Sequence, residues 1–421
     1  MLTIAYLANQ FPSPVEPYVL DEIKELRRRG VRVVTGTVRK PSAANKQSTE
    51  PDIALQPVGI FLLLRGAWLC ARKWELISPL LKRVVVRGHE SLLQRIKAFF
   101  HTWLGASYAL LLEARNVDHI HVHHGYFGSW IAMTAARLLN VGFSMTLHGS
   151  DLLISAAYLD VKLTNCLFCL TVSDYNRHYI LEKYPGISAA KVIVSRLGVA
   201  VVDSPSRPRQ TPKSARFSLL AVGRLHAVKD HALLIRACAQ LHAGAVDFEC
   251  FIAGEGPERP HLESLIRKLG LEGRVALLGH IQREQLDSLY GRADVVVLTS
   301  RSEGLPLVLM EAMAHGKIVI APAITGIPEL VILGKTGFLY EPGLIDDFVS
   351  RVLTIHSLTE AERHGRHFSR QLAWVRHAAR THVRHNFDRE KNLESFCDAF
   401  LSRIAPPVET LPHENLILQQ I

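Results

Sequence analysis

Residues 295–340, VVVLTSRSEGLPLVLMEAMAHGKIVIAPAITGIPELVILGKTGFLY, decide the fold of this chain. The apolar run from Val295 to Leu298 is rich in β-branched residues and predicts a short strand. Residues 302–306 predict a tight turn, and the apolar periodicity from Leu307 to Met313 predicts a helix with proline in its first turn. Such a junction leaves helix N–H groups without intrahelical partners, and these groups suit a phosphate or a sugar hydroxyl.

Two carboxylates lie at this junction, Glu303 in the turn and Glu311 about two turns into the helix. In one interpretation Glu303 only caps the helix and Glu311 lies on its solvated face. A glycosidase pair is disfavoured, because a rise of roughly 1.5 Å per residue separates the two carboxylates by about 12 Å along the axis, whereas glycosidase pairs are roughly 5–9.5 Å apart. In the other interpretation they contact different parts of one ligand.

The spacing of Glu303 and Glu311, with Gly-Leu-Pro directly after the first, resembles the retaining glycosyltransferase family 4, whose members have the GT-B fold. The resemblance continues in Gly-x-Pro-Glu at 326–329 and in Gly-Phe-Leu-Tyr at 337–340. It implies that Glu303 contacts the sugar of a nucleotide-sugar donor and that Glu311 contacts the ribose. The backbone amides that it places near the sugar and the phosphates are those of Gly304, Leu305 and Leu307.

Length and composition bound the class of protein. A chain of 421 residues predicts two domains of about 200 residues each. Hydrophobic residues make up 48% and charged residues 21% of the chain, which is typical of a globular protein and excludes a disordered one. The formal charge of +10 favours anionic partners: nucleotide phosphates, acidic lipid headgroups or nucleic acid. Charge alone does not choose among them.

The cysteines are few and irregularly spaced, which predicts a reducing compartment rather than a disulfide framework. Cys166 and Cys169 fall in the run CLFCLTV, which reads as a buried strand rather than a metal or redox site. No basic and apolar leader opens the sequence, and it contains no run of about 18 uncharged apolar residues. We therefore expect a cytoplasmic protein, in one interpretation held peripherally on the inner face of the cytoplasmic membrane.

An acceptor-side Rossmann-like domain is predicted at residues 1–205. Its first elements are expected at strand 2–7, loop 9–14, helix 16–29 and strand 31–38. This order predicts a doubly wound opening with a ligand loop at the carboxyl end of the first strand. Many members of the resembled family have a glycine pair in that loop, but here it reads NQFPSP. In this departure the chain resembles the exopolysaccharide and colanic-acid branch of the family.

Residues 41–57 are polar and predict a mobile loop. The amino-acid composition changes after this loop. Aromatic and basic residues are interleaved over residues 58–112. Three interpretations stay open: helices on an anionic membrane surface, aromatics in the core with cations on a solvated face, and stacking on nucleic acid. Because no RNA- or DNA-binding module is recognisable, we expect no nucleic-acid partner. The aromatic residues are Phe61, Trp68, Trp74, Phe99, Phe100, Trp103 and Tyr108.

Three histidines, His119, His121 and His123, alternate with aliphatic residues, which predicts a strand with the imidazoles on one face. The outer two would lie roughly 13 Å apart, too far to share a metal ion. We expect that this strand instead ends at the cleft.

A second histidine motif follows the predicted strand 143–146. His148 comes directly after that strand, and Asp151 is the expected N-cap of the next helix. Alone, this pattern fits a structural histidine. The resembled family has a His-x-x-Asp element in this place, which implies that His148 lies against the donor sugar.

A nucleotide-sugar-binding Rossmann-like domain is predicted at residues 215–375, after the proline-rich linker 203–214. It opens with a strand at 217–222, followed by a glycine and two cations at the start of a helix. This pattern suits a diphosphate, although it is also common on ordinary protein surfaces. The resemblance implies that Arg224 and Lys229 bind the donor diphosphate and that the base is held near His280. The glycines at two strand ends, Gly223 and Gly254, would let the donor approach the backbone. A helix within residues 376–405 is expected to cross back to the first domain.

The sequence therefore predicts an α/β protein with the GT-B architecture, two doubly wound Rossmann-like domains facing across a cleft. The predicted function is retaining transfer of a sugar from a nucleotide-diphosphate donor, UDP favoured over GDP, to a hydroxyl of a lipid-linked glycan. The catalytic residues implied by the resemblance are His148, Glu303, Arg224 and Lys229. Because the sequence contains no Asp-x-Asp pair, no metal and no other cofactor is expected. A nucleotide-sugar epimerase and a non-catalytic scaffold on a membrane surface are the alternatives.

Overall fold

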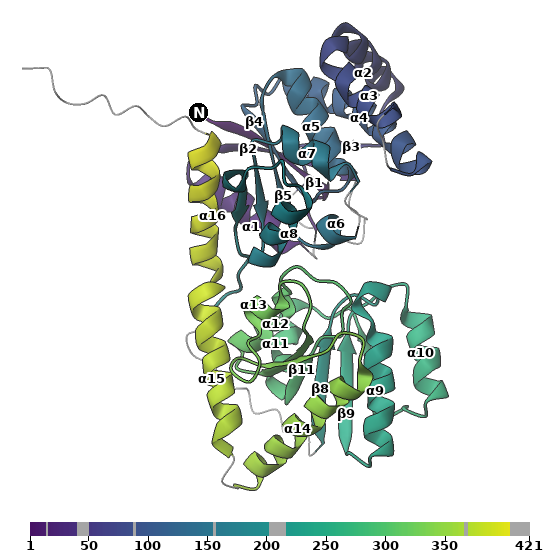
Figure 1. The fold of residues 1–421 in the computed structure, drawn as a ribbon, viewed down its shortest axis with the longest axis vertical. Coiled ribbons are helices and arrows are strands. Elements are labelled where there is room, and N and C mark those ends of the chain that lie inside the picture. Colours follow the sequence, from purple (N-terminus) through teal and green to yellow (C-terminus); the bar gives the residue numbers. More distant parts are fainter. Residues whose placement is uncertain are drawn as a thin grey trace, which may run out of the picture.

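Two parallel sheets organise the chain, and buried side chains cover both faces of each sheet (Figure 1). The structure, a computed structural model, describes residues 1–13, 16–39, 50–86, 90–154, 157–201, 216–365 and 369–404. The predicted linker at 203–214 lies outside the described residues, so the predicted domain boundaries stay predictions.

The first sheet has the strand order β3-β2-β1-β4-β5-β6-β7, and all of its pairings are parallel. Its strands are β1 (Thr3–Gln10), β2 (Arg32–Arg39), β3 (Ile53–Gln56), β4 (His119–His123), β5 (Gly142–Leu147), β6 (Phe168–Thr171) and β7 (Val192–Val194). Alternate residues of β1 point to opposite faces: Ile4 and Tyr6 join one core, and Ala5 and Leu7 join the other. The sheet is therefore doubly wound, and its order reverses between β1 and β4.

The helices of this domain are α1 (Pro17–Arg28), α2 (Ile60–Arg72), α3 (Trp74–Val85), α4 (Leu92–Glu113), α5 (Phe127–Leu139), α6 (Ser150–Leu153), α7 (Leu159–Asn165) and α8 (Asp174–Lys183). Local sequence explains several boundaries. Pro17 occupies the first helical position of α1, where a missing N–H has no cost. Ser91 and Gln94 form a capping box that begins α4.

The edge strand β3 corrects one prediction. We expected a loop over residues 41–57, but residues 53–56 pair with β2 in parallel. Ile53 and Leu55 alternate with half-buried residues and are almost fully buried, which places them in the core under α4. Residues 40–49, where the rest of that loop was expected, lie outside the described residues.

The second sheet has the order β10-β9-β8-β11-β12-β13, again parallel throughout. Its strands are β8 (Phe217–Val222), β9 (Phe248–Ala253), β10 (Val275–Gly279), β11 (Val295–Val297), β12 (Ile318–Pro322) and β13 (Phe338–Tyr340). Its helices are α9 (His231–Ala243), α10 (Arg259–Lys268), α11 (Arg283–Arg292), α12 (Leu307–Ala314), α13 (Ile327–Leu330), α14 (Ile345–Arg363) and α15 (Ser369–Asn386). The order reverses between β8 and β11, so the loops after these two strands border the crevice where such folds bind ligands.

The chain crosses between the two domains twice, and backbone hydrogen bonds join the segments at the two crossings. After α15, which packs on α12 and α14, helix α16 (Arg389–Ile404) packs on α1 (Figure 1). At the crossing, the N–H of Val199 donates to the carbonyl of Phe387 at 2.9 Å, and the N–H of Arg389 donates to the carbonyl of Val199 at 3.0 Å. Among the described helices none is long and apolar enough to cross a membrane.

Candidate active site

A cavity of about 270 Å³ lies between the two domains, at the carboxyl ends of β5, β8 and β11. The first domain contributes the loop that follows β5 and Tyr18 of α1. The second domain contributes the turn after β8 and the junction between β11 and α12. The predicted site residues that line it are His148, Arg224, Lys229, Glu303, Gly304, Leu305 and Leu307. The two sheets thus converge on one cavity, whereas the roles of these residues stay predictions.

Lys229 and Glu303 form an ion pair inside this cavity, with Nζ and Oε1 2.5 Å apart. Both side chains are mostly buried, at 18% and 12% exposure. The carbonyl of Lys229 accepts a hydrogen bond from Thr299 Oγ1 at 3.0 Å, which fixes the turn after β8 to the loop after β11. A cation and a carboxylate are thus held together at the carboxyl ends of two adjacent strands. A single ligand that carries an anionic group and hydroxyls can contact both side chains there.

The two domains meet backbone to backbone beside this ion pair. A Cβ atom added to Gly304 would lie 1.9 Å from the carbonyl oxygen of His148, and one added to Gly149 would lie 2.8 Å from the amide nitrogen of Gly304. A Cβ atom added to Gly326 would lie 2.7 Å from the carbonyl oxygen of Gly304 in its own domain and 3.0 Å from the Cβ atom of Ser173 in the first domain. Only glycine permits this approach, and two of these glycines, Gly149 and Gly304, line the cavity.

His148 stands at the first-domain wall, in contact with Tyr18 at 4.8 Å between ring centroids. Its Nε2 pairs with Nδ1 of His123 at 2.9 Å, and Nε2 of His123 pairs with Glu22 at 2.9 Å. Burial, and then the charges of His124 and His123, hold the pKa of His148 well below its usual value. At neutral pH His148 is therefore a neutral imidazole, able to hydrogen-bond a sugar hydroxyl without repelling other cations.

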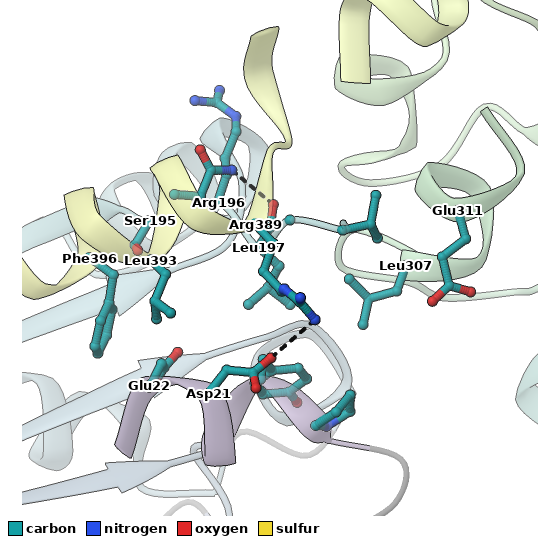
Figure 2. A pocket seen from close by; sticks show the side chains of 15 residues that line it. Asp21, Glu22, Ser195, Arg196, Leu197, Leu307, Glu311, Arg389, Leu393 and Phe396 are labelled. Atoms are coloured by element: carbon teal, nitrogen blue, oxygen red, sulfur yellow. Dashed lines mark hydrogen bonds and ion pairs between the residues drawn. The ribbon is translucent and has the colours of Figure 1, made fainter. Parts of the chain in front are cut away.

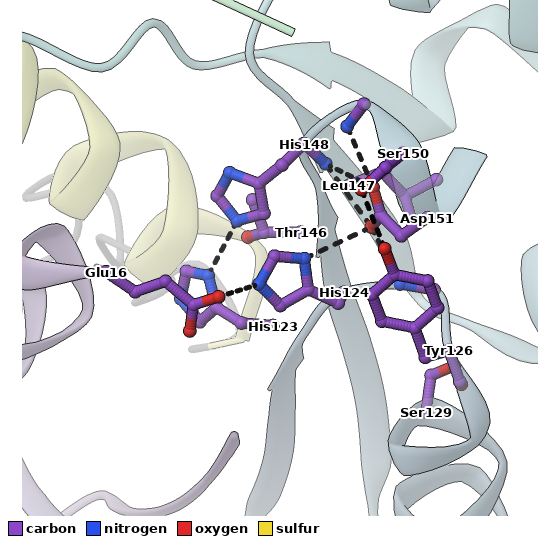
Figure 3. A network of polar contacts seen from close by, with 12 residues as sticks. Glu16, His123, His124, Tyr126, Ser129, Thr146, Leu147, His148, Ser150 and Asp151 are labelled. Carbon is purple, nitrogen blue, oxygen red and sulfur yellow. Dashed lines mark hydrogen bonds and ion pairs between the residues drawn. The ribbon is translucent and has the colours of Figure 1, made fainter. Parts of the chain in front are cut away.

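Asp151 shapes the loop that carries His148 (Figure 3). Its buried carboxylate accepts hydrogen bonds from the N–H groups of Gly125 at 2.8 Å, Gly149 at 2.8 Å and His148 at 3.1 Å. The prediction that Asp151 is a helix N-cap is wrong: Gly149 is the N-cap of α6, and Asp151 lies in the first turn and bonds backward. The aspartate therefore fixes the turn between β5 and α6.

His124 lies between two carboxylates, 2.8 Å from Glu16 and 3.6 Å from Asp151 (Figure 3). Burial opposes its charged form, but the two carboxylates outweigh burial and raise the pKa of His124 to about 10. Burial would raise the pKa of Asp151, and His124 instead holds it well below its usual value. A buried carboxylate–imidazolium–carboxylate cluster thus ties α1 to the loop after β5.

The other strand histidines face the core. His119 and His121 both bond the hydroxyl of Ser144, at 2.6 and 2.8 Å, and His121 also bonds Thr146 at 3.1 Å. Within the described ranges no three His, Cys, Asp or Glu side chains are placed to hold a metal ion. Only His123 reaches the cleft, through His148, as expected for the end of the strand.

Three predicted donor residues lie along the same sheet edge but do not line the cavity: Gly223, Gly254 and His280. The N–H of Gly254 donates to the carbonyl of Gly279 at 2.8 Å, and a Cβ on Gly254 would lie 1.9 Å from the carbonyl oxygen of Gly223. These glycines pack backbone against backbone, and His280 is exposed beside them. Their donor contacts stay predictions.

Glu311 does not line this cavity. It lines a separate pocket of about 60 Å³, across from Asp21 and Arg389 (Figure 2), and another of about 150 Å³ beside Tyr290. It accepts a hydrogen bond from the hydroxyl of Tyr290 at 3.1 Å. Leu307 lines both the smaller of these pockets and the cavity, so Glu311 is about one helical turn from the cavity wall. The structure therefore separates the two predicted carboxylates, and the ribose contact of Glu311 stays a prediction.

Sequence reasoning missed the residues that support the site from the first domain. Tyr18 and Glu22 come from α1, and their partners His148 and His123 lie more than a hundred residues later. No local pattern marks such a contact. A partial signal for Glu329 existed in the Gly-x-Pro-Glu motif: its carboxylate accepts the N–H groups of Asp174 and Tyr175 at 3.0 and 2.7 Å, across the two domains.

Two family models match the chain, one described as Glycosyltransferase Family 4 over residues 15–203 and one as Glycosyl transferases group 1 over residues 203–370. The chain is 32% identical to the putative colanic acid biosynthesis glycosyltransferase WcaL of Escherichia coli K12 over 49% of the chain and 50% of that protein. It is 34% identical to the alpha-D-kanosaminyltransferase of Streptomyces kanamyceticus over 33% of the chain and 38% of that protein. The matches thus span about half, or less, of these curated relatives.

Solved structures share the architecture. A glycosyltransferase from Rickettsia africae has a TM-score of 0.70 at 20% identity, over 96% of this chain and 99% of that one. Anabaena Alr3699/HepE, crystallised in complex with UDP, has a TM-score of 0.70 at 20% identity, over 96% of this chain and 100% of that one. With two doubly wound domains, a cavity between them and both family models matched, the chain belongs to glycosyltransferase family 4 and has the GT-B fold.

Proposed function

We propose that this protein transfers a sugar, with retention of configuration, from a nucleoside diphosphate donor to a hydroxyl of a glycan. The observation that carries the proposal is the Lys229–Glu303 pair beside Arg224 and His148 in one cavity between the domains. UDP is the favoured nucleotide, and a lipid-linked glycan is the favoured acceptor. The similarity to proteins named for colanic acid biosynthesis supports a role in polysaccharide synthesis.

The leaving diphosphate is stabilised by charge. Lys229 and the exposed guanidinium of Arg224 border the cavity from one turn, so both can meet phosphate oxygens as negative charge develops there. Lys229 then lies between the diphosphate and Glu303, and Glu303 remains free to accept hydrogen bonds from sugar hydroxyls. The neutral imidazole of His148 contacts the sugar from the opposite wall.

Retention follows from front-face attack. Among the described residues that line the cavity, Glu303 carries the only carboxylate, and its ion pair with Lys229 makes it a weak nucleophile. The acceptor oxygen forms its bond to the anomeric carbon as the bond to the diphosphate breaks. The departing phosphate oxygen takes the acceptor proton. Closure of the domains around the donor excludes water from this step.

A thermal-shift screen against UDP, GDP, ADP and their sugars tests the donor. A ligand at about 100 times its Kd adds about 2.7 kcal/mol of stability, a Tm rise of roughly 5–11 °C for a domain of this size. We expect UDP to give the largest rise and Arg224→Ala to remove most of it. Arg236, exposed on α9, supplies the control: Arg236→Ala should keep the full rise. Equal rises in the two variants would refute the proposed diphosphate contact.

Turnover distinguishes the alternatives. With donor and a lipid extract as acceptor, we expect a product with the anomeric configuration of the donor, measured by NMR. An epimerase would interconvert the sugar of the donor with no acceptor present. A scaffold would consume no nucleotide sugar, and its vesicle binding would be unchanged by Glu303→Ala.

A further inference from the structure

Helices α2, α3 and α4 expose an unusual number of apolar side chains. They lie together at the end of the first domain, away from α14 and the second domain (Figure 1). More than half of the exposed large hydrophobic residues in the described ranges belong to this one segment, and each is at least 45% exposed. We call them the apolar face: Ile60, Phe61, Leu64, Trp68, Trp74, Val85, Val86, Leu92, Leu93, Ile96, Phe99 and Phe100.

The apolar face is a folded surface rather than a loosely packed core. The opposite sides of the same helices are anchored: Ile77, Leu80 and Val84 of α3 are buried in the main core of the first domain. The indole N–H of Trp103 in α4 donates to the carbonyl of Leu63 in α2 at 2.6 Å. The exposed rings are therefore presented outward by a rigid support.

Cations accompany the apolar side chains. On α2, residues Phe61, Leu64, Arg65, Trp68 and Arg72 recur at helical spacing, so rings and guanidinium groups share one side of the helix. The guanidinium of Arg72 lies 5.2 Å from the ring centroid of Trp68. Apolar anchors with interleaved cations are typical of helices that bind the interface of an anionic membrane.

The charge balance of the exposed groups supports the same partner. Arg65, Arg72, Lys82 and Lys97 are exposed, whereas the exposed acids on the three helices are Glu75 and, at the far end of α4, Glu113. Two other cations of these helices serve the fold: Lys73 donates to the carbonyl of Leu138 at 2.6 Å, and Arg83 pairs with Glu90 and Asp160.

A rigid path joins this segment to the active site. His101 of α4 stacks on Phe127 at the start of α5, with ring centroids 4.7 Å apart. The preceding residue, Tyr126, pairs through its hydroxyl with Ser150 at 2.7 Å, and Ser150 lines the cavity. A surface docked through α2–α4 would thus hold the cavity at a fixed position relative to it.

We propose that the apolar face docks on an anionic lipid bilayer, which presents the lipid-linked acceptor to the cavity. The acceptor part of this inference rests on the proposed function, whereas the docking does not. The occupant is a bilayer and not a protein groove or nucleic acid, because large apolar side chains and cations are combined on one projecting end of the molecule.

Vesicle co-sedimentation tests the docking. Wild-type protein is expected to bind phosphatidylcholine vesicles that contain phosphatidylglycerol at least tenfold better than pure phosphatidylcholine vesicles, and less well at high salt. The triple variant Phe61→Ser, Trp68→Ser, Phe99→Ser should lose at least tenfold in binding. The control triple, Leu344→Ser, Leu353→Ser, Trp374→Ser, removes exposed apolar side chains of the second domain and should bind as wild type does.

Nucleotide binding separates this inference from the proposed function. The Phe61, Trp68, Phe99 variant should keep the nucleotide-dependent Tm rise of the wild type, which also shows that it folds. Equal loss of vesicle binding in both triple variants would overturn the docking. A different result would also overturn the docking: wild-type protein that does not bind vesicles but forms dimers, with the Phe61, Trp68, Phe99 variant remaining monomeric. The apolar face would then join two copies of the chain.

Discussion

Gly304→Ala tests whether the close contact between the domains matters for transfer. The new Cβ would lie 1.9 Å from the carbonyl oxygen of His148, and real Cβ atoms do not approach closer than 3.0 Å. The two loops must therefore separate by at least 1.1 Å. Because the opposing atom belongs to the backbone, no side-chain rotation relieves the overlap. Because the contact joins two domains, opening of the cleft relieves it without unfolding either one.

The expected cost is in the rate rather than in stability. A displacement of about 1 Å between catalytic groups costs on the order of 100-fold in rate, or about 2.7 kcal/mol of transition-state stabilisation. We expect kcat to fall by roughly this factor with the nucleotide sugar selected by the thermal-shift screen. The Tm should change little, since Gly304 has no positive φ that alanine would strain.

A matched variant controls for the added methyl group. Gly291 of α11 has no neighbour within 4 Å of an added Cβ, so Gly291→Ala should keep the wild-type rate. Initial rates of nucleotide release and the radius of gyration from small-angle scattering should be measured for both variants. A Gly304→Ala protein with wild-type turnover and an unchanged radius of gyration would refute the reasoning.

His124→Asn should destabilise the first domain by about 3 kcal/mol, because it removes a buried cation between Glu16 and Asp151. The folded-state pKa of His124 is raised to about 10 from 6.5, so its contribution is complete below pH 6.5 and is lost as the pH rises toward 10. Urea unfolding at several pH values should show that the difference in the free energy of unfolding between wild type and variant shrinks over this pH range. A constant difference would mean that His124 is neutral. Glu329→Gln weakens charge-assisted hydrogen bonds to α8 and Arg196 across the domains. We expect about tenfold lower turnover and a larger radius of gyration, and an unchanged radius would show that Glu329 does not hold the cleft closed.

The core of the site could be predicted from the sequence because its chemistry sits at strand ends. Lys229 follows β8 and Glu303 follows β11, and these strands are neighbours in the sheet. Parallel strands of a doubly wound sheet end at one edge, so recognising strand, turn and helix twice was enough to bring the two residues together. The GT-B fold, expected from the family resemblance, is confirmed by the structure and the family models.

Orientation around a helix could not be predicted in the same way. The spacing of Glu303 and Glu311 gives a distance along the axis, but the direction of Glu311 depends on how α12 packs on its neighbours. Its contact with Tyr290 of α11 directs it away from the cavity, toward a pocket that both residues line. Likewise, Glu22 and His123 pair across two distant elements, and neither residue has a local signal.

The aromatic segment shows a third limit. Its sequence left open whether the aromatic residues of 58–112 lie in the core or on the surface, and the structure places some of them in each. Tyr108 is fully buried, whereas Phe61 is 80% exposed. Helical periodicity places aromatic residues on more than one side of these helices, and only the packing of α4 on α5 decides which side is covered.

A crystal structure of the protein with an intact UDP-sugar tests the central claim most directly. The account predicts diphosphate oxygens within about 3 Å of Arg224 and Lys229, with a sugar hydroxyl donating to Glu303. His148 should contact the same sugar from the first domain. A nucleotide bound elsewhere, with Lys229 still paired to Glu303 and no phosphate contact, would contradict it.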